Sequence, residues 1–321
     1  MSGLSTVVCA IVANYETLLL SRALIGFCVG LNLWIHSVMI VELVSSNEIV
    51  GTIVTISKLM YTVGGVWPAV LGYLLLDVVG WRVFILLISL PTIIPPIFML
   101  HFCFSGTAGP NIQFEEDGAV HSETVGVPNM IARVTKLGLC RALSMFQGWL
   151  TILLVPTLIQ LIKTRNTELE SGCTETATQG AELLILALVT FAALPGKLFA
   201  SFLKDRVHYR KSQVIVAMLN IGTFAAMSLQ ESIVVVTVTN FIVKFLYGIS
   251  NMATYYIFID KEYFGTDNFA LASSVANAIG LVGGVAGTAV VAFAPTLYVI
   301  ITALVLSVLQ ILVVLSMTDV R

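Results

Sequence analysis

Charged residues are scarce in this sequence. Asp, Glu, Lys and Arg make up 11% of the 321 residues, whereas 58% of the residues are apolar and the mean hydropathy is +0.98. About a quarter of the residues of a typical soluble domain are charged, so this composition excludes an ordinary water-soluble fold. The net charge of −2 indicates neither nucleic acid nor an anionic surface as a partner.

Sequence patterns for catalysis and metal binding are also absent. The 5 cysteines show no CxxC or metal-ligand spacing, which predicts neither a disulfide framework nor a zinc site. No H-E-x-x-H, G-x-S-x-G or P-loop lysine pattern occurs, so we expect no enzyme activity, and nothing points to a cofactor. The positively charged start that a secretory signal needs is missing before Leu4.

What the sequence does contain is a series of long apolar runs. A helix needs about 20 apolar residues to cross about 30 Å of hydrocarbon. We expect full spans near residues 17–44, 51–76, 82–104, 139–162, 180–203, 212–230, 232–259, 268–294 and 296–317. Residues 3–14 would reach only about 18 Å, so they predict a partial span. The predicted fold is all-α, a polytopic membrane protein with about nine full spans and one partial span.

A long polar segment, residues 105–138, interrupts this pattern. It carries Glu115, Glu116 and Asp117 and two prolines, a composition that buries too little apolar surface to fold alone. We interpret it as a flexible linker, with a regulatory site as the alternative. The predicted organisation is an N-terminal helical bundle at 1–104, the linker at 105–138 and a six-helix bundle at 139–321.

Lysine and arginine are distributed unevenly between the two sides of the predicted membrane topology. One side has Arg82, Lys163 and Arg165, and the other has Arg133, Lys136, Arg141, Lys204, Arg206, Arg210, Lys211, Lys261 and Arg321. The side richer in positive charge should be cytoplasmic. The linker and the C-terminus are therefore predicted to lie in the cytoplasm, with the spans in the plasma membrane or an intracellular vesicle membrane.

The two helical blocks share landmarks in the same order. In each block a basic residue, a glycine, a glutamate and a glycine pair recur, and the two copies are about 220 residues apart. The copies are Arg22 and Lys244, Gly26 and Gly248, Glu42 and Glu262, and Gly64 and Gly283. This spacing predicts a duplicated unit in which the first copy lacks two helices and part of a third. We expect either an N-terminal truncation of a twelve-helix protein or a ten-helix derivative of one.

Four features of the sequence form a recognisable set: SRALIGFCVG at 21–30 followed by Glu42, GWR at 80–82, LPGKLFASFLKDRVHYRK at 194–211, and Glu262. Together they resemble the major facilitator superfamily, and within it the organic-ion, sugar and synaptic-vesicle-2-related branch. The third motif is similar to a second-half copy of the family's D-R-x-G-R-K signature, with Asp205 and Arg206 kept and His208 in place of the glycine. The resemblance implies that the fourth, seventh and tenth helices of that fold line a central cavity. It also implies a cytoplasmic gate of charged residues, for which Asp205, Arg206, Glu262 and Glu42 are the candidates.

One face of the run at 232–259, the tenth helix in this alignment, is polar. Asn240, Lys244, Tyr247, Asn251 and Tyr255 recur at steps of three and four, which keeps them in one sector of a helix. An ammonium group in hydrocarbon costs at least ~2.5 kcal/mol, so Lys244 should face protein, water or an opposite charge. We expect these five residues to line the cavity, where Lys244 attracts an anionic substrate or pairs with a mobile carboxylate. The alternatives are a structural ion pair and a snorkelling lysine.

Three further residues are candidates for the same cavity. Gln147 shares a face with Ser144 and Thr151 in the seventh helix. Arg22 serves either binding or packing, and Lys58, one turn from Tyr61, either borders the cavity or has a structural role. No metal site is predicted.

The predicted function is a secondary transporter that moves a small organic solute by alternating access. An organic ion is the favoured solute, and in particular an anion, because Arg22, Lys58 and Lys244 are positive. The alternative is a truncated, non-transporting membrane protein that binds a partner. Expected partners are the solute, with or without a coupling ion, and the lipid bilayer, but no nucleic acid.

Overall fold

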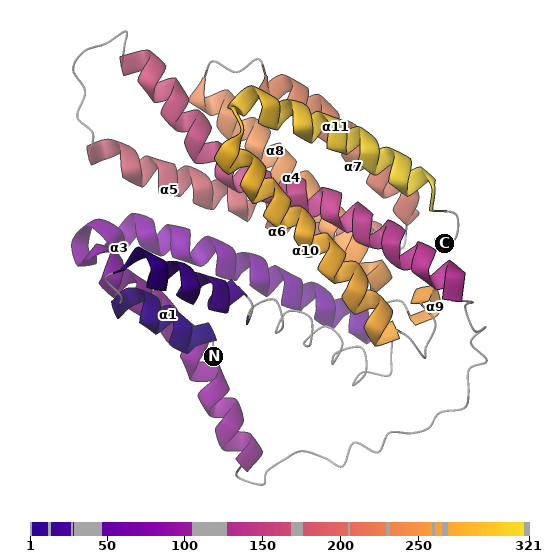
Figure 1. Ribbon diagram of the computed structural model, residues 1–321, viewed down its shortest axis with the longest axis horizontal. Coiled ribbons are helices and arrows are strands. Elements are labelled where there is room, and N and C mark those ends of the chain that lie inside the picture. The colour runs from indigo at the N-terminus through magenta and orange to yellow at the C-terminus, as the bar shows by residue number, and fades with distance from the viewer. Residues whose placement is uncertain are drawn as a thin grey trace. The chain divides into compact units, whose positions relative to one another are not determined.

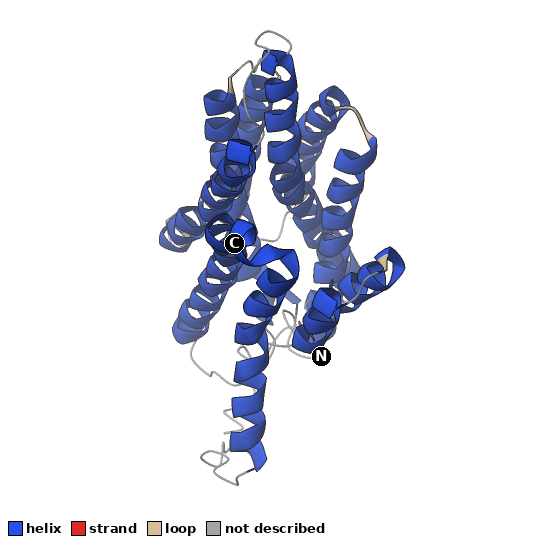
Figure 2. Cartoon of the chain, turned by 90° about the vertical axis from the view of Figure 1, so that its left-hand side faces the viewer, coloured by secondary structure: helices blue, strands red, loops and turns tan. Residues whose placement is uncertain are grey.

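The computed structural model describes residues 2–11, 14–26, 28, 47–104, 127–167, 176–204, 206–228, 232–258, 261–264 and 269–317. Over these ranges every regular element is a helix (Figure 2), which confirms the all-α prediction. Six helical segments are long and apolar enough to cross a membrane. They are Gly51–Pro91, Asn129–Gln160, Glu182–Leu203, Ile233–Phe258, Phe269–Phe293 and Thr296–Leu315. The polytopic fold is therefore confirmed, although the described residues contain fewer spans than the nine expected.

The difference in number arises at three places. Most of the span expected at 17–44 lies outside the described residues. The runs at 51–76 and 82–104 belong to one element, α3 (Asn47–Phe104). The run expected at 212–230 is helix α7 (Tyr209–Met227), in which residues such as Arg210, Lys211 and Gln213 make the segment less apolar than the six spans.

Helix α3 is divided at Gly80. Its 58 residues would extend for about 87 Å as one straight helix, far more than the membrane thickness. Gly80 has a φ of 73°, the single positive φ in the described part of the chain, and this backbone conformation interrupts the helix. The break falls between the two runs that the sequence predicts as separate spans.

The described helices form two units. The first unit comprises residues 1–39 and 71–122, and the second comprises residues 40–70 and 123–321. In the first unit, α1 (Ser2–Ile11), the helix at 15–26 and the second part of α3 pack around Cys9, Ala10 and Ile85. The domain boundaries expected at 104 and 138 stay a prediction, and α4 (Val127–Thr167) already begins inside the expected linker.

Helix α4 lies at the centre of the second unit. It packs against α10 (Phe269–Phe293), α8 (Ile233–Phe258), α11 (Thr296–Leu315) and α5 (Thr176–Phe191), as Figure 1 shows for the first three of these. Helix α6 (Ala193–Leu203) packs against α8, and α7 packs against α8 and α11. Apolar side chains of α4, α7, α8 and α11, among them Leu150, Phe224 and Val243, form a core cluster of the second unit.

Small residues set the closest helix contacts. A Cβ on Gly248 of α8 would lie 2.5 Å from the Ala193 carbonyl of α6, and a Cβ on Gly196 of α6 would overlap the Phe245 carbonyl of α8. The backbones of α6 and α8 therefore touch at a point where no side chain fits, as is common for helices packed within membranes.

A buried polar cluster joins α7, α8 and α11. Gln213 donates to the Ser250 carbonyl at 2.9 Å, and its side-chain oxygen accepts from the Ser250 hydroxyl at 2.7 Å. Gln310 of α11 donates to the same oxygen at 3.3 Å. Hydrogen bonds between polar side chains are a normal means of fixing neighbouring membrane helices, so we assign this cluster a structural role.

Candidate substrate site

The polar face expected on α8 is present. Asn240, Lys244, Asn251 and Tyr255 are buried, and Tyr247 is partly buried. Helix α8 contacts α4, α5, α6 and α7, so a residue on its inner face meets protein on several sides. The side chains of α8 therefore point toward other helices at the positions that the spacing indicated.

Lys244 lies about midway along α8 and contacts α4. Its ammonium donates to the Gly148 carbonyl at 2.8 Å and lies 4.8 Å from the centroid of the Tyr247 ring. A Cβ at Gly148 would overlap that ring, so glycine at this position lets Tyr247 lie against the α4 backbone. The Lys244 side chain is 4% exposed. Among the described residues, the ammonium thus contacts a carbonyl and a ring, and no carboxylate.

Arg141 is the second cation of the site and comes from α4. Its guanidinium donates to the Asn251 side-chain oxygen at 3.1 Å and to the Tyr255 hydroxyl at 2.9 Å. Its Cζ atom lies 4.3 Å from the centroid of the Tyr255 ring. Arg141 is 2% exposed, and its Nε atom is buried without a hydrogen-bond partner among the described residues. Because a guanidinium stays protonated in proteins, Arg141 is a permanent buried positive charge.

Two lysines extend the site toward α3 and α6. The Lys58 ammonium lies 3.9 Å from the centroid of the Tyr255 ring. Lys197 of α6 donates to the Lys58 carbonyl at 2.8 Å and to the Thr62 hydroxyl. Both lysines are buried. Together with the α8 face, they bring four cations from four helices into one connected network.

Tyr247 and Asn251 connect the two ends of this network. The amide of Asn251 donates to the Tyr247 hydroxyl at 3.2 Å, and that hydroxyl contacts the Met145 sulfur, also at 3.2 Å. The contacts therefore run without a gap from Lys244 through Tyr247 and Asn251 to Arg141. We call the four cations Lys58, Arg141, Lys197 and Lys244, with Tyr247, Asn251 and Tyr255, the cationic site.

Three of the four cations of the cationic site have only neutral hydrogen-bond partners in the part of the chain that the structure describes. Among the described residues, the hydrogen-bond acceptors of Arg141, Lys197 and Lys244 are carbonyl, hydroxyl and amide oxygens, and no carboxylate contacts these three side chains. Each charge in the centre of a membrane costs about 2.5–3.5 kcal/mol, and mutual repulsion adds to this cost. An arrangement of this kind is suited to binding an anion.

Two of the predicted cavity residues have other contacts. The Asn240 amide donates to the Val236 carbonyl of its own helix at 2.7 Å. Gln147 donates to the Ser307 hydroxyl at 2.9 Å and accepts from Asn220 at 3.0 Å, so it joins α4 to α11 and α7. Among the described residues, the Gln147 side chain therefore bonds to α7 and α11, whereas Lys244 contacts the neighbouring Gly148 carbonyl.

The remaining predicted residues are either exposed or outside the described residues. Arg22 is exposed in the first unit. Asp205 and Glu42 lie outside the described residues, and so does the side chain of Glu262 in α9 (Lys261–Phe264). Arg206 is exposed, and its Cζ atom lies 4.1 Å from the centroid of the Phe202 ring. The gate that the resemblance implies therefore stays a prediction.

Two residues of the cationic site do not belong to the set that the sequence predicts for the cavity. Arg141 was assigned to the positively charged cytoplasmic side, but it lies within the span Asn129–Gln160. Lys197 does not belong to the residues predicted for the cavity, and its buried ammonium bonds to Lys58 and Thr62 of α3. Arg141, Met145 and Gly148 lie on one face of α4, the face that meets Tyr247 and Asn251. In the described part of the chain, no group of three or more His, Cys, Asp or Glu side chains could hold a metal ion.

The helical fold with its apolar spans and buried charges defines a multi-pass membrane protein built around a polar site. Residues 1–288 match the family model of the Major Facilitator Superfamily, so the chain belongs to this superfamily. The superfamily comprises membrane-embedded secondary transporters of small solutes, which fits the lack of catalytic motifs in the sequence. A search of curated proteins found no match.

Proposed function

We propose that this protein is a secondary transporter that carries a small organic anion through the cationic site by alternating access. The observation that carries this proposal is the set of three buried cations, Arg141, Lys197 and Lys244, whose hydrogen-bond partners among the described residues are all neutral. An anionic solute would supply the missing opposite charge.

The electrostatic energies of these charges favour a bound anion over a purely structural role. The Lys58 ammonium and the Arg141 guanidinium lie 3.9 and 4.3 Å from the same ring centroid, so they are at most about 8 Å apart. At an effective dielectric constant of about 20, two unit charges at this distance repel by about 2 kcal/mol. An anion at about 4 Å from each of them gains about 4 kcal/mol per contact, which outweighs the repulsion.

The aromatic residues of the site suit an organic solute. Tyr247 and Tyr255 present ring faces next to the cations, and their hydroxyls are already engaged by Asn251 and Arg141. A solute with an acidic group and an apolar body would place the acidic group on the cations and the body against the rings.

Uptake into proteoliposomes tests this proposal. The purified protein would be reconstituted and offered three radiolabelled solutes of similar size, an aromatic carboxylate, an aromatic amine and an uncharged aromatic alcohol. We expect saturable uptake of the carboxylate alone. Saturable uptake of the amine or the alcohol instead, or partner binding without movement of any solute, would overturn the proposal.

A further inference from the structure

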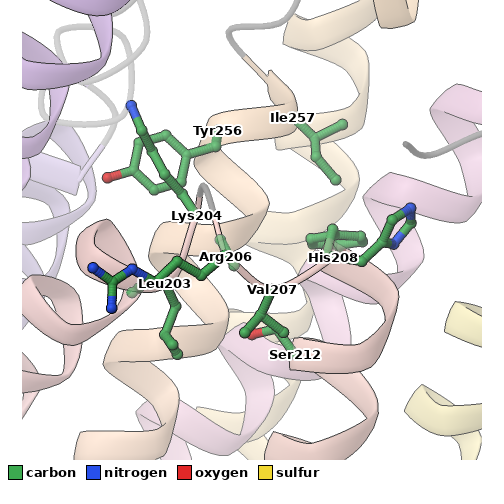
Figure 3. A pocket seen from close by; sticks show the side chains of 11 residues that line it. Leu203, Lys204, Arg206, Val207, His208, Ser212, Tyr256 and Ile257 are labelled. Atoms are coloured by element: carbon green, nitrogen blue, oxygen red, sulfur yellow. The ribbon is translucent and has the colours of Figure 1, made fainter.

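A second cationic site lies outside the network described above, where α6 ends and α7 begins. A pocket of about 380 Å³ is lined there by residues of α6, of the connecting turn, and of α7 and α8 (Figure 3). Among its lining residues are Lys204, Arg206, His208, Tyr256 and Ser212. The pocket shares no residue with the cationic site.

Among the described residues, the side chains of Lys204 and Arg206 have no hydrogen-bond or ion-pair partner. Both side chains are exposed. Their positions are set by aromatic rings, because the Lys204 ammonium lies 5.3 Å from the Tyr256 centroid and the Arg206 Cζ atom lies 4.1 Å from the Phe202 centroid. In Figure 3 the Lys204 ammonium and the Arg206 guanidinium lie on the same side of the pocket, and the His208 ring lies on the other side.

Tyr256 and His208 are occupied by other contacts. The Thr55 hydroxyl donates to the Gly51 carbonyl at 2.7 Å, so in its 2.9 Å contact with Tyr256 the tyrosine hydroxyl is the donor. The Nδ1 atom of His208 accepts from the Arg210 backbone N–H at the start of α7. The pocket therefore offers a ring, an ammonium and a guanidinium, and the last two are the donors that best match phosphate oxygens.

The pocket lies at the ends of two spans. The span in α6 ends at Leu203 and the span in α8 ends at Phe258, next to the lining residue Ile257. The surface of α6 that leads toward this end carries Phe199 and Phe202, which are 46% and 56% exposed. This arrangement matches a lipid molecule. The acyl chains would lie against the apolar surface of α6, and the charged headgroup would lie at the two cations.

We propose that this pocket binds a phosphate group, and that the phosphate belongs to an anionic lipid. The net charge of −2 gives no hint of such a site, because the two cations act locally within a chain that is acidic on average. The cytoplasmic leaflet, on which the sequence predicts this end of the spans to lie, is the leaflet that carries anionic lipids.

Native mass spectrometry of the detergent-solubilised protein tests the proposal. The protein would be titrated with phosphatidic acid, with phosphatidylcholine and with inorganic phosphate, and the bound molecules would be counted. We expect preferential binding of phosphatidic acid, weakened about fivefold in Lys204→Gln or Arg206→Gln and about thirtyfold in the double variant. Lys211→Gln removes the same charge on α7 outside the pocket lining and should bind as the wild type does.

The outcomes separate the sources of the phosphate. Loss of phosphatidic acid binding in the double variant, with the control unchanged, supports a lipid ligand. Binding of inorganic phosphate that is lost in the same variant supports the site and assigns it to a soluble ligand. Equal binding of phosphatidic acid by the wild type, the double variant and Lys211→Gln would overturn the proposal. Arg206→Lys keeps the charge and should retain most of the binding, which guards against a folding defect.

Discussion

Replacing Arg141 by glutamine removes one of the four positive charges of the cationic site. Truncating one partner of a buried, hydrogen-bonded charge pair costs about 2–5 kcal/mol, and an anion at about 4 Å gains about 4 kcal/mol from such a cation. We therefore expect the KM for an organic anion to rise about a hundredfold in Arg141→Gln, which corresponds to about 2.8 kcal/mol. Arg141→Lys keeps the charge but not the two simultaneous hydrogen bonds, so its KM should be intermediate.

The same variant separates binding from a structural role. Loss of the hydrogen bonds to Asn251 and Tyr255 destabilises the protein, but relief of about 2 kcal/mol of repulsion with Lys58 offsets this loss. We expect the Tm in detergent to change little. The measurement is initial uptake into proteoliposomes against solute concentration, with Lys136→Gln, an α4 cation bonded to the Ser316 carbonyl, as the control. An unchanged KM in Arg141→Gln, or a large fall in Tm without ligand, would refute the reasoning.

Substitutions at three further positions, Lys244, Tyr255 and Gly148, test the site. Lys244→Ala should abolish uptake while surface expression, measured by surface biotinylation, persists; unchanged uptake would contradict a role in binding. Tyr255→Phe removes the hydroxyl that accepts from Arg141 and keeps the ring, so its KM should rise less than that of Tyr255→Leu, and equal KM values would exclude a contribution from the ring. Gly148→Ala should lower the Tm and the uptake rate, because its Cβ would overlap the Tyr247 ring and overpacking costs about 1–3 kcal/mol. Gly222→Ala, which has open space, should change neither, and an equal effect of both would argue against the close contact.

The sequence was sufficient to predict the polar face of α8. The face depends on a period of three to four residues within one helix, and a lysine inside an apolar run is costly unless it faces protein. Both signals are local, so they do not require knowledge of the neighbouring helices. The structure accordingly has Lys244, Asn251 and Tyr255 buried within the second unit.

The sequence alone did not indicate which face of α4 contacts α8. Ser144, Gln147 and Thr151 form the more polar face, but Gln147 contacts Asn220 and Ser307 on α7 and α11. The face that meets α8 carries Arg141 and Gly148, and it depends on how α4 is rotated about its axis. That rotation is set by packing against α10 and α8, which is information about other helices.

The landmarks of the predicted duplication have unequal surroundings in the two blocks. Gly248 and Gly283 of the second block lie against the carbonyls of Ala193 and Ala142, whereas Gly64, the counterpart of Gly283, has open space among the described residues. Lys244 is buried in the cationic site, but its counterpart Arg22 is exposed. A repeated sequence preserves the positions of residues along the helices, but burial depends on the partners of each helix. The cation that the repeat pattern marks in both blocks is buried against protein in the second unit, so the proposed anion site should be tested first by substitutions there.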